Sequence, residues 1–266
     1  MRVLLGQLAP VAGEPRRNAE TIARHIAEHP DAELAVFPEL FLSGYRAPDL
    51  DGASVDAISS VLEPVLAAAE KHATAAMFGF AERHDGQIAN SVGLVAADGS
   101  WRGSYRKTHL FGGWERETFT AGDALRLVEL ADERVGPLIC FDMEFPEPAR
   151  ALARAGASLL VTCSANMEPY GPDHALAMRA RALDNRLPHV YVNRVGEEAG
   201  LRFAGGSAVI AADGSIVAEL GSVAEVRCVE LPTDHHIAAD VDYLALLRPD
   251  LEVEGTASTI AEGGAR

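Results

Sequence analysis

The chain has 266 residues, of which 48% are hydrophobic, and its formal net charge at pH 7 is −16. This length and composition allow one large α/β domain with a sizeable core. The acidic balance excludes a nucleic-acid partner, because binding a phosphate backbone needs a basic stripe, and no apolar run approaches the roughly 18 residues of a membrane span.

The first half of the chain alternates strand and helix patterns. Strands are predicted over Val3–Leu8, Leu34–Phe37 and Ala75–Phe80, and helices over Arg16–Glu28 and 54–72, the second with Ser54 or Asp56 as its cap. A hairpin follows, in which Val92–Ala97 and Trp101–Tyr105 are joined by the turn Asp98-Gly99. No signal peptide is expected, since the first residues have the pattern of a strand.

The second half repeats this alternation. Strands are predicted over Arg126–Leu130, Val135–Ile139, Ser158–Thr162, His189–Val195, Ser207–Ala212, Ile216–Leu220 and Val226–Leu231. Helices are predicted from near Glu147 to about Ala155, over Asp173–Asn185, and from His235 to about Leu247.

A short repeated motif relates the two halves. Val95-Ala96-Ala97-Asp98-Gly99-Ser100 is echoed by Ile210-Ala211-Ala212-Asp213-Gly214-Ser215, and each copy follows a set of alternating strands and helices. We therefore expect two similar halves in one α/β domain over residues 1–266, a four-layer αββα sandwich whose two mixed sheets are related by a pseudo-two-fold axis. The tail from about 248 to 266 is expected to be an arm.

Three strand-like runs each end in a reactive side chain. Glu39 follows Val36-Phe37-Pro38, Lys107 follows Tyr105-Arg106, and Cys140 lies between an apolar strand and a proline-started helix. A thiol at such a corner is expected to have a lowered pKa, because unpaired N–H groups and the positive end of the helix dipole gather there. Lysine is rare in this chain, which has only Lys71 and Lys107, so Lys107 stands out as a compact ammonium.

A carboxylate, an ammonium and a thiol in this chain order resemble the Glu-Lys-Cys triad of the nitrilase superfamily of carbon-nitrogen hydrolases. The resemblance runs from Gln7-Leu8 through Phe37-Pro38-Glu39-Leu40, Arg106-Lys107-Thr108-His109-Leu110, Cys140-Phe141-Asp142 and Arg179-Ala180-Arg181-Ala182 to Gly205-Gly206-Ser207. It implies the αββα fold, cysteine-dependent hydrolysis through a thioester, a homodimer or higher homo-oligomer, and no metal or other cofactor.

The resemblance also implies a role for each residue. Cys140 is the nucleophile, Lys107 stabilises the thiolate and the oxyanion with the backbone N–H of Phe141 as second donor, and Glu39 is the general acid and base. A second glutamate of the family corresponds to Glu115, with Glu117 as the competing choice. The substrate pocket is expected to include Tyr45, Trp114, Glu144, Asn166 and Met167.

Two other groups compete for a chemical role. Cys163 also ends an apolar run, but it leads into a loop and is interpreted as a buried thiol beside the pocket. His235 and His236 suggest a metal site, yet adjacent side chains point to different faces, so a helix start is the preferred interpretation. The three cysteines form neither a disulfide framework nor a CxxC pair, which indicates a reducing cytoplasm.

The substrate class is the open part of the prediction. Nitrilases proper tend to have Trp-Glu after the cysteine, whereas this chain has Phe141-Asp142, and the arginine that binds a substrate carboxylate is replaced by Met143-Glu144. A small neutral or amine-bearing carboxamide is therefore the predicted substrate. N-carbamoyl compounds and ω-amido acids remain alternatives within the family, and a metal-dependent amidohydrolase or a non-catalytic interaction domain are alternatives from other classes.

Overall fold

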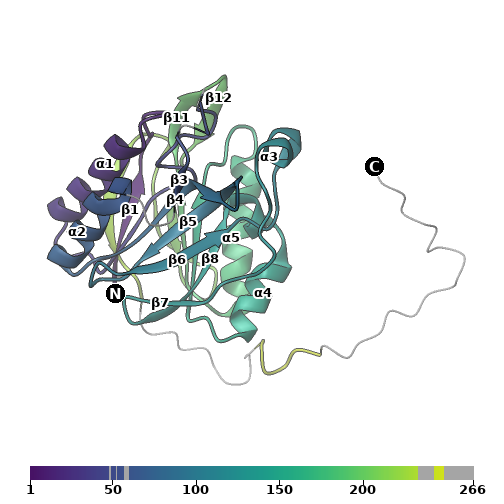
Figure 1. Cartoon of the computed structure of the whole chain (residues 1–266). Helices are drawn as coiled ribbons and strands as arrows, with labels where there is room; N and C mark the ends of the chain where they lie inside the picture. Colours follow the sequence, from purple (N-terminus) through teal and green to yellow (C-terminus); the bar gives the residue numbers. More distant parts are fainter. Residues whose placement is uncertain (48, 52, 57–59, 233–242, 249–266) are drawn as a thin grey trace, which may run out of the picture.

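Two mixed β-sheets pack face to face and are covered by helices on both outer sides (Figure 1). The structure, a computed structural model, describes residues 1–47, 49–51, 53–56, 60–232 and 243–248. Helices α1 (Pro15–Glu28) and α2 (Glu63–His72) cover one sheet, and α4 (Pro146–Arg154) and α5 (Gly171–Asn185) cover the other. The predicted four-layer αββα sandwich is confirmed.

The first sheet has the order β15-β1-β2-β4-β5-β6. Its strands are β15 (Glu225–Glu230), β1 (Arg2–Gln7), β2 (Leu34–Val36), β4 (Ala75–His84), β5 (Gln87–Val95) and β6 (Trp101–Arg106), with the short β3 (Val55–Asp56) beside β4. The three strands β1, β2 and β4 are parallel, and the strands on either side of them run antiparallel.

The second sheet has the order β14-β13-β10-β9-β8-β7. Its strands are β14 (Ile216–Glu219), β13 (Ala208–Ile210), β10 (His189–Asn193), β9 (Leu159–Ser164), β8 (Glu133–Ile139) and β7 (Val128–Leu130). Again three central strands, β8, β9 and β10, are parallel and flanked by antiparallel ones. Read from β15 and from β7, the two sheets have the same succession of strand directions, as the predicted pseudo-two-fold relation requires.

The repeated motif forms the same turn in both halves. Asp98 Oδ1 accepts a 2.9 Å hydrogen bond from the backbone N–H of Ser100 between β5 and β6, and Asp213 Oδ1 accepts a 2.8 Å bond from that of Ser215 between β13 and β14. Gly99 and Gly214 adopt φ of 75° and 81°, a left-handed conformation that glycine reaches without strain. The echo is therefore a structural repeat.

Two local predictions were wrong. Residues 54–72 do not form one helix capped at Ser54 or Asp56, because Val55–Asp56 pairs with β4 and the helix begins at Glu63, after a 3-10 turn, η1 (Ser60–Leu62). Pro64 lies in the first turn, where a helix tolerates proline. The strand predicted to reach Val195 ends at Asn193.

Besides β3 and the 3-10 turns, two elements were not predicted. The first is the hairpin of β11 (Val195–Glu198) and β12 (Leu201–Ala204), and the second is the short helix α3 (Gly112–Thr118). The helix predicted from His235 to about Leu247 lies outside the described residues except for 243–247, where the structure has a turn at 243–246 and no helix. The histidine pair at its start and the arm predicted over 248–266, apart from Arg248, lie outside the described residues. No helix in the described part of the chain has both the length and the apolar character needed to cross a membrane.

The core between the sheets joins both halves of the chain. Its buried side chains come from both sheets, among them Val36 of β2, Met77 of β4, Val161 of β9 and Val190 of β10. Strands β2, β6 and β8 therefore belong to one packed core. These strands end just before Glu39, Lys107 and Cys140, respectively. The rigid sheets thus fix where these three residues lie.

Candidate active site

Glu39 is buried in the turn after β2, where the backbone of this turn comes unusually close to the backbone of β4. Leu40, the next residue, has φ of 51°, and a Cβ placed on Gly79 would lie 2.2 Å from the Leu40 nitrogen. Real Cβ atoms do not approach so closely, so β4 needs glycine at this position. The close approach brings Glu39 into the interior between the sheets.

Three donors hold the Glu39 carboxylate. Its Oε1 accepts hydrogen bonds from Lys107 Nζ at 2.6 Å and from Asn90 Nδ2 at 2.7 Å, and its Oε2 accepts one from the backbone N–H of Ala165 at 2.8 Å. Since Ala165 follows β9, the carboxylate links the two sheets. Such a set of donors fixes the orientation of a group that has to transfer protons.

Lys107 lies between two carboxylates and has no exposed side-chain surface. Its Nζ is 2.6 Å from Glu39 Oε1 and 2.9 Å from Glu115 Oε2. Glu115, on α3, also accepts hydrogen bonds from Tyr45 Oη at 2.6 Å and from the backbone N–H of Phe111 at 2.8 Å. Glu117 is exposed. The geometry therefore favours Glu115 over Glu117 as the second glutamate.

Cys140 is the first residue of a 3-10 turn, η2 (Cys140–Glu144), that follows β8 directly. Its φ is 45°, a left-handed conformation that a residue with a side chain rarely adopts. The expected strand-to-helix corner is thus a tight turn inserted before α4. This strained backbone presents the thiol to the site, in the way that strain often accumulates at functional positions.

Burial and charge set the proton affinities at this site. Burial, reinforced by the Glu39 carboxylate, raises the pKa of the Cys140 thiol well above its usual range, although Lys107 and Ser164 pull it down. The predicted lowered pKa is therefore wrong, because desolvation outweighs the turn. Burial also raises the pKa of Glu39, and the charges of Glu39 and Glu115 raise that of Lys107 against its own burial.

Asp142 ties the nucleophile turn to the segment after Lys107. Its side chain accepts hydrogen bonds from Tyr105 Oη at 2.8 Å, from the Ile139 N–H at 3.1 Å, and from the N–H groups of Thr108 and His109 at 3.2 and 2.9 Å. His109 Nδ1 lies 2.9 Å from the same carboxylate, which raises the pKa of that imidazole. His109 therefore supports the site through Asp142.

A narrow pocket opens on Cys140. Four of the five predicted pocket residues line it, namely Tyr45, Glu144, Asn166 and Met167. The fifth, Trp114, packs against Tyr45 with the rings tilted by 40° and their centroids 5.1 Å apart, and so supports the wall from behind. The sequence reasoning missed the lining residues Phe111, Tyr170 and His174; the first lies four residues before Glu115, and the other two follow Met167 closely in the chain.

The rival nucleophile, Cys163, does not line this pocket. Cys163 is fully buried within β9 and packs in the core between the sheets. Burial raises its pKa, so the thiol holds its proton. Cys163 pairs with Ile139, the residue before Cys140, so it is a buried thiol beside the pocket, as interpreted from the sequence.

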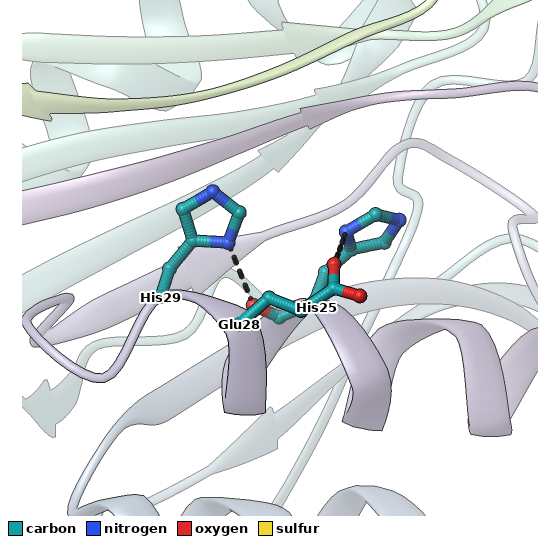
Figure 2. A group of neighbouring side chains, drawn as sticks. All are labelled: His25, Glu28 and His29. Atoms are coloured by element: carbon teal, nitrogen blue, oxygen red, sulfur yellow. Dashed lines mark hydrogen bonds and ion pairs between the residues drawn. The ribbon is translucent and has the colours of Figure 1, made fainter.

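One group of side chains in the described residues has the composition of a metal site, and it lies on α1, outside the pocket. His25, Glu28 and His29 bring potential ligand atoms within 4.8 Å of one another (Figure 2). Within the group, His25 Nδ1 is 3.0 Å from Glu28 Oε2, and His29 Nδ1 is held at 2.9 Å from the carbonyl oxygen of His25. The Arg24 guanidinium, 3.2 Å from His25 Nε2, disfavours a further cation.

Comparison with known proteins places this chain among amide hydrolases. Residues 2–237 match the family described as Carbon-nitrogen hydrolase. The chain is 40% identical over 265 residues to an (R)-stereoselective amidase of Pseudomonas sp., covering 96% of this chain and 94% of the relative. It is 41% identical over 232 residues to the hydrolase in the pqqF 5' region of Pseudomonas protegens, covering 83% and 79%.

A solved structure agrees with these relatives. The amidase from Nesterenkonia sp. superposes with a TM-score of 0.83 at 28% identity, covering 93% of both chains. A further structure of that amidase is described as a member of the nitrilase superfamily. Together with the strand-end motifs, these matches establish that the chain belongs to the carbon-nitrogen hydrolase family, within the nitrilase superfamily.

Proposed function

We propose that the chain hydrolyses a carbon–nitrogen bond of small carboxamides, releasing ammonia or an amine and a carboxylic acid through a thioester on Cys140. The observation that carries this proposal is the buried network in which Lys107 Nζ lies between Glu39 and Glu115, beside the pocket that Cys140 lines. Burying a lysine and two carboxylates costs desolvation free energy. Such buried charged groups are therefore often found at functional sites. At this position the charge of Lys107 interacts with the Cys140 thiol.

In the acylation step, the Cys140 sulfur attacks the amide carbon while Glu39 takes the thiol proton. The raised pKa of Glu39 supports this role, since it makes the carboxylate a stronger base. The oxyanion is stabilised by the Lys107 ammonium and by the backbone N–H of Phe141, the residue that follows Cys140 in the η2 turn. Glu39 then gives its proton to the departing nitrogen, and the thioester remains.

In the deacylation step, Glu39 takes a proton from water, and the resulting hydroxide attacks the thioester carbon. The carbon–sulfur bond breaks, the carboxylic acid leaves, and Cys140 recovers its proton. Glu115 does not touch the reacting atoms in this scheme. It orients the Lys107 ammonium, to which it lies 2.9 Å away, and is itself held by Tyr45.

The pocket supports an amide without a carboxylate. Its lining residues include no arginine or lysine among the described residues, so an ω-amido acid or an N-carbamoyl amino acid would lack a cationic partner. In the Nesterenkonia amidase, mutant enzymes have been solved with acrylamide and with butyramide, and one mutant carries the acetamide moiety of fluoroacetamide on its active-site cysteine. Those ligands are small amides without a carboxylate.

Intact-mass spectrometry tests the proposal. The protein is mixed with pooled carboxamides, carbamoyl compounds and nitriles, and we expect an adduct whose mass identifies the acyl group. The adduct should disappear in Cys140→Ala and persist in Cys163→Ala, the buried control. Turnover that survives Cys140→Ala and is lost with a chelator would favour a metal-dependent amidohydrolase, and no adduct or turnover with any compound would favour a non-catalytic domain.

We infer that the protein acts as a single hydrolase domain, as the core shared by both sheets supports, and that it pairs as a homodimer through helices beside the active site. Leu176 and Leu183 on α5 have 71% and 37% of their surface exposed, which supports an interface there. Analytical ultracentrifugation of the protein and of Leu176→Glu tests this.

A reducing cytoplasm is the proposed location, because Cys140 and two other cysteines are free thiols.

A further inference from the structure

Glu144 brings a carboxylate into the pocket that the proposed mechanism does not use. It is the last residue of η2, four positions after Cys140, and 32% of its side chain is exposed. Its Oε1 lies 3.0 Å from Nε2 of His174, which is buried on α5. The second carboxylate oxygen has no partner among the described residues, and the side chain lines the same pocket as the thiol.

The position of Glu144 is fixed by more than this contact. Arg181, also on α5, donates from Nε to the carbonyl oxygen of Met143 at 3.0 Å and from Nη2 to that of Glu144 at 3.1 Å. The guanidinium is therefore occupied by the backbone of the turn and by Asp184. Arg181 supports the carboxylate without neutralising it, and Glu144 is held in place before any ligand arrives.

The wall around Glu144 is aromatic. Phe111 packs edge-to-face against Phe141, with ring centroids 5.3 Å apart, and against Tyr170, with centroids 5.6 Å apart. All three rings line the pocket. Aromatic faces attract ammonium groups, and the attraction grows when the site excludes water. A carboxylate beside such rings, with no lysine or arginine in the lining, is a recognition site for a cation.

We propose that the preferred substrates are carboxamides that also carry an ammonium group, and that Glu144 binds this group while Cys140 attacks the amide. This inference rests on the proposed amidase function and deepens it. Glu144 is a specificity residue here: it pairs with the ammonium through its second oxygen, while the aromatic wall covers the alkyl linker. A neutral amide offers no positive charge to this second oxygen.

Matched substrate pairs test the inference, because an ammonium and a methyl group are nearly the same size. The pairs are glycinamide with propionamide, 3-aminopropanamide with butyramide, and 4-aminobutanamide with pentanamide; their different lengths locate the ammonium subsite. We expect kcat/KM to be about 10- to 100-fold higher for the ammonium member of at least one pair, the range for a hydrogen bond to a charged partner.

The decisive readout is how a variant changes this ratio. In Glu144→Gln the preference should fall by about tenfold or more, because the amide keeps the shape and removes the charge. The control is Glu168→Gln, which changes the same charge at an exposed position near the pocket and should keep the wild-type ratio. An unchanged ratio in Glu144→Gln, or neutral amides preferred in every pair, overturns the inference while the amidase function stands.

A second measurement needs no variant. Propylammonium should inhibit butyramide hydrolysis competitively and more strongly than 1-propanol does, since only the cation offers a charge to Glu144. Equal or stronger inhibition by 1-propanol would overturn the inference. If the wild-type enzyme turns over none of the amides in any pair, both the proposed function and this inference fail.

Discussion

The hydroxyl of Tyr105 donates a 2.8 Å hydrogen bond to the carboxylate of Asp142, and so joins the two sheets directly beneath the active site. Tyr105 belongs to β6 of the first sheet, whereas Asp142 lies in the turn after β8 of the second. Lys107 and Cys140 are each two residues away from this bond. The relative position of ammonium and thiol therefore depends on it.

Tyr105→Phe should lower the free energy of unfolding by about 1 to 3 kcal/mol, the cost of removing one hydrogen bond to a buried charged group. Urea denaturation followed by circular dichroism measures it. Tyr170→Phe is the control, since that side chain is 41% exposed and its loss of a hydroxyl should change stability by less than about 0.5 kcal/mol. Equal stabilities of the two variants would contradict the role of the bond.

Glu115→Gln should lower kcat/KM by about 30- to 100-fold, because Lys107 loses one of its two counter-charges and its fixed orientation. The charge of Glu115 also raises the pKa of Glu39, so the acid limb of the pH profile should move to lower pH in this variant. Glu117→Gln, an exposed change on the same helix, should leave both quantities unchanged within about twofold. The reverse ranking would assign the role to Glu117.

Sequence patterns predicted the architecture because the buried strands are short apolar runs and the helices have regular apolar spacing. They failed where local composition and tertiary pairing disagree. Val55 fits a helical spacing, yet it pairs beside β4 in the sheet. The hairpin β11–β12 is rich in glutamate, and its turn at Ala199-Gly200, where both residues have positive φ, was the available signal.

The triad positions were predictable because each lies at the end of a strand, in a motif with a recognisable context. The electrostatics were not, since the pKa of Cys140 depends on burial, which emerges only when both sheets and α3 close over the site. Pocket residues such as His174 and Tyr170 were missed for a related reason. They come from the start of α5, whose approach to the η2 turn is a tertiary contact.

The pH dependence of kcat/KM should have an acid limb above the ordinary glutamate pKa. Glu39 must be ionised to accept the thiol proton, and burial raises its pKa, so activity is full above that raised value and falls as the pH drops through it. Initial rates with a neutral amide between pH 4 and 8 measure the limb, with circular dichroism at each pH to verify folding. An acid limb at or below the model-peptide pKa of about 4.3 would show that burial does not dominate the pKa of Glu39.

Gly79→Ala should damage both stability and activity. Its Cβ would lie 2.2 Å from the Leu40 nitrogen and 2.5 Å from the Glu39 Cα, so the backbone that carries the catalytic carboxylate has to move. Overpacking of this kind costs about 1 to 3 kcal/mol or more, and a shift of about 1 Å in Glu39 can cost about 100-fold in kcat.

Gly113→Ala is the matched control, because it makes the same chemical change at a helical glycine of α3 with no atom within 4 Å of the added Cβ. Its free energy of unfolding should be unchanged or higher by up to about 1 kcal/mol, as expected for alanine in a helix. Thermal unfolding and kcat with one amide compare the two variants. If Gly79→Ala retained wild-type kcat, the carboxylate of Glu39 would not depend on the close contact between β4 and the turn after β2, and the rigid placement of the base by the sheet would be refuted.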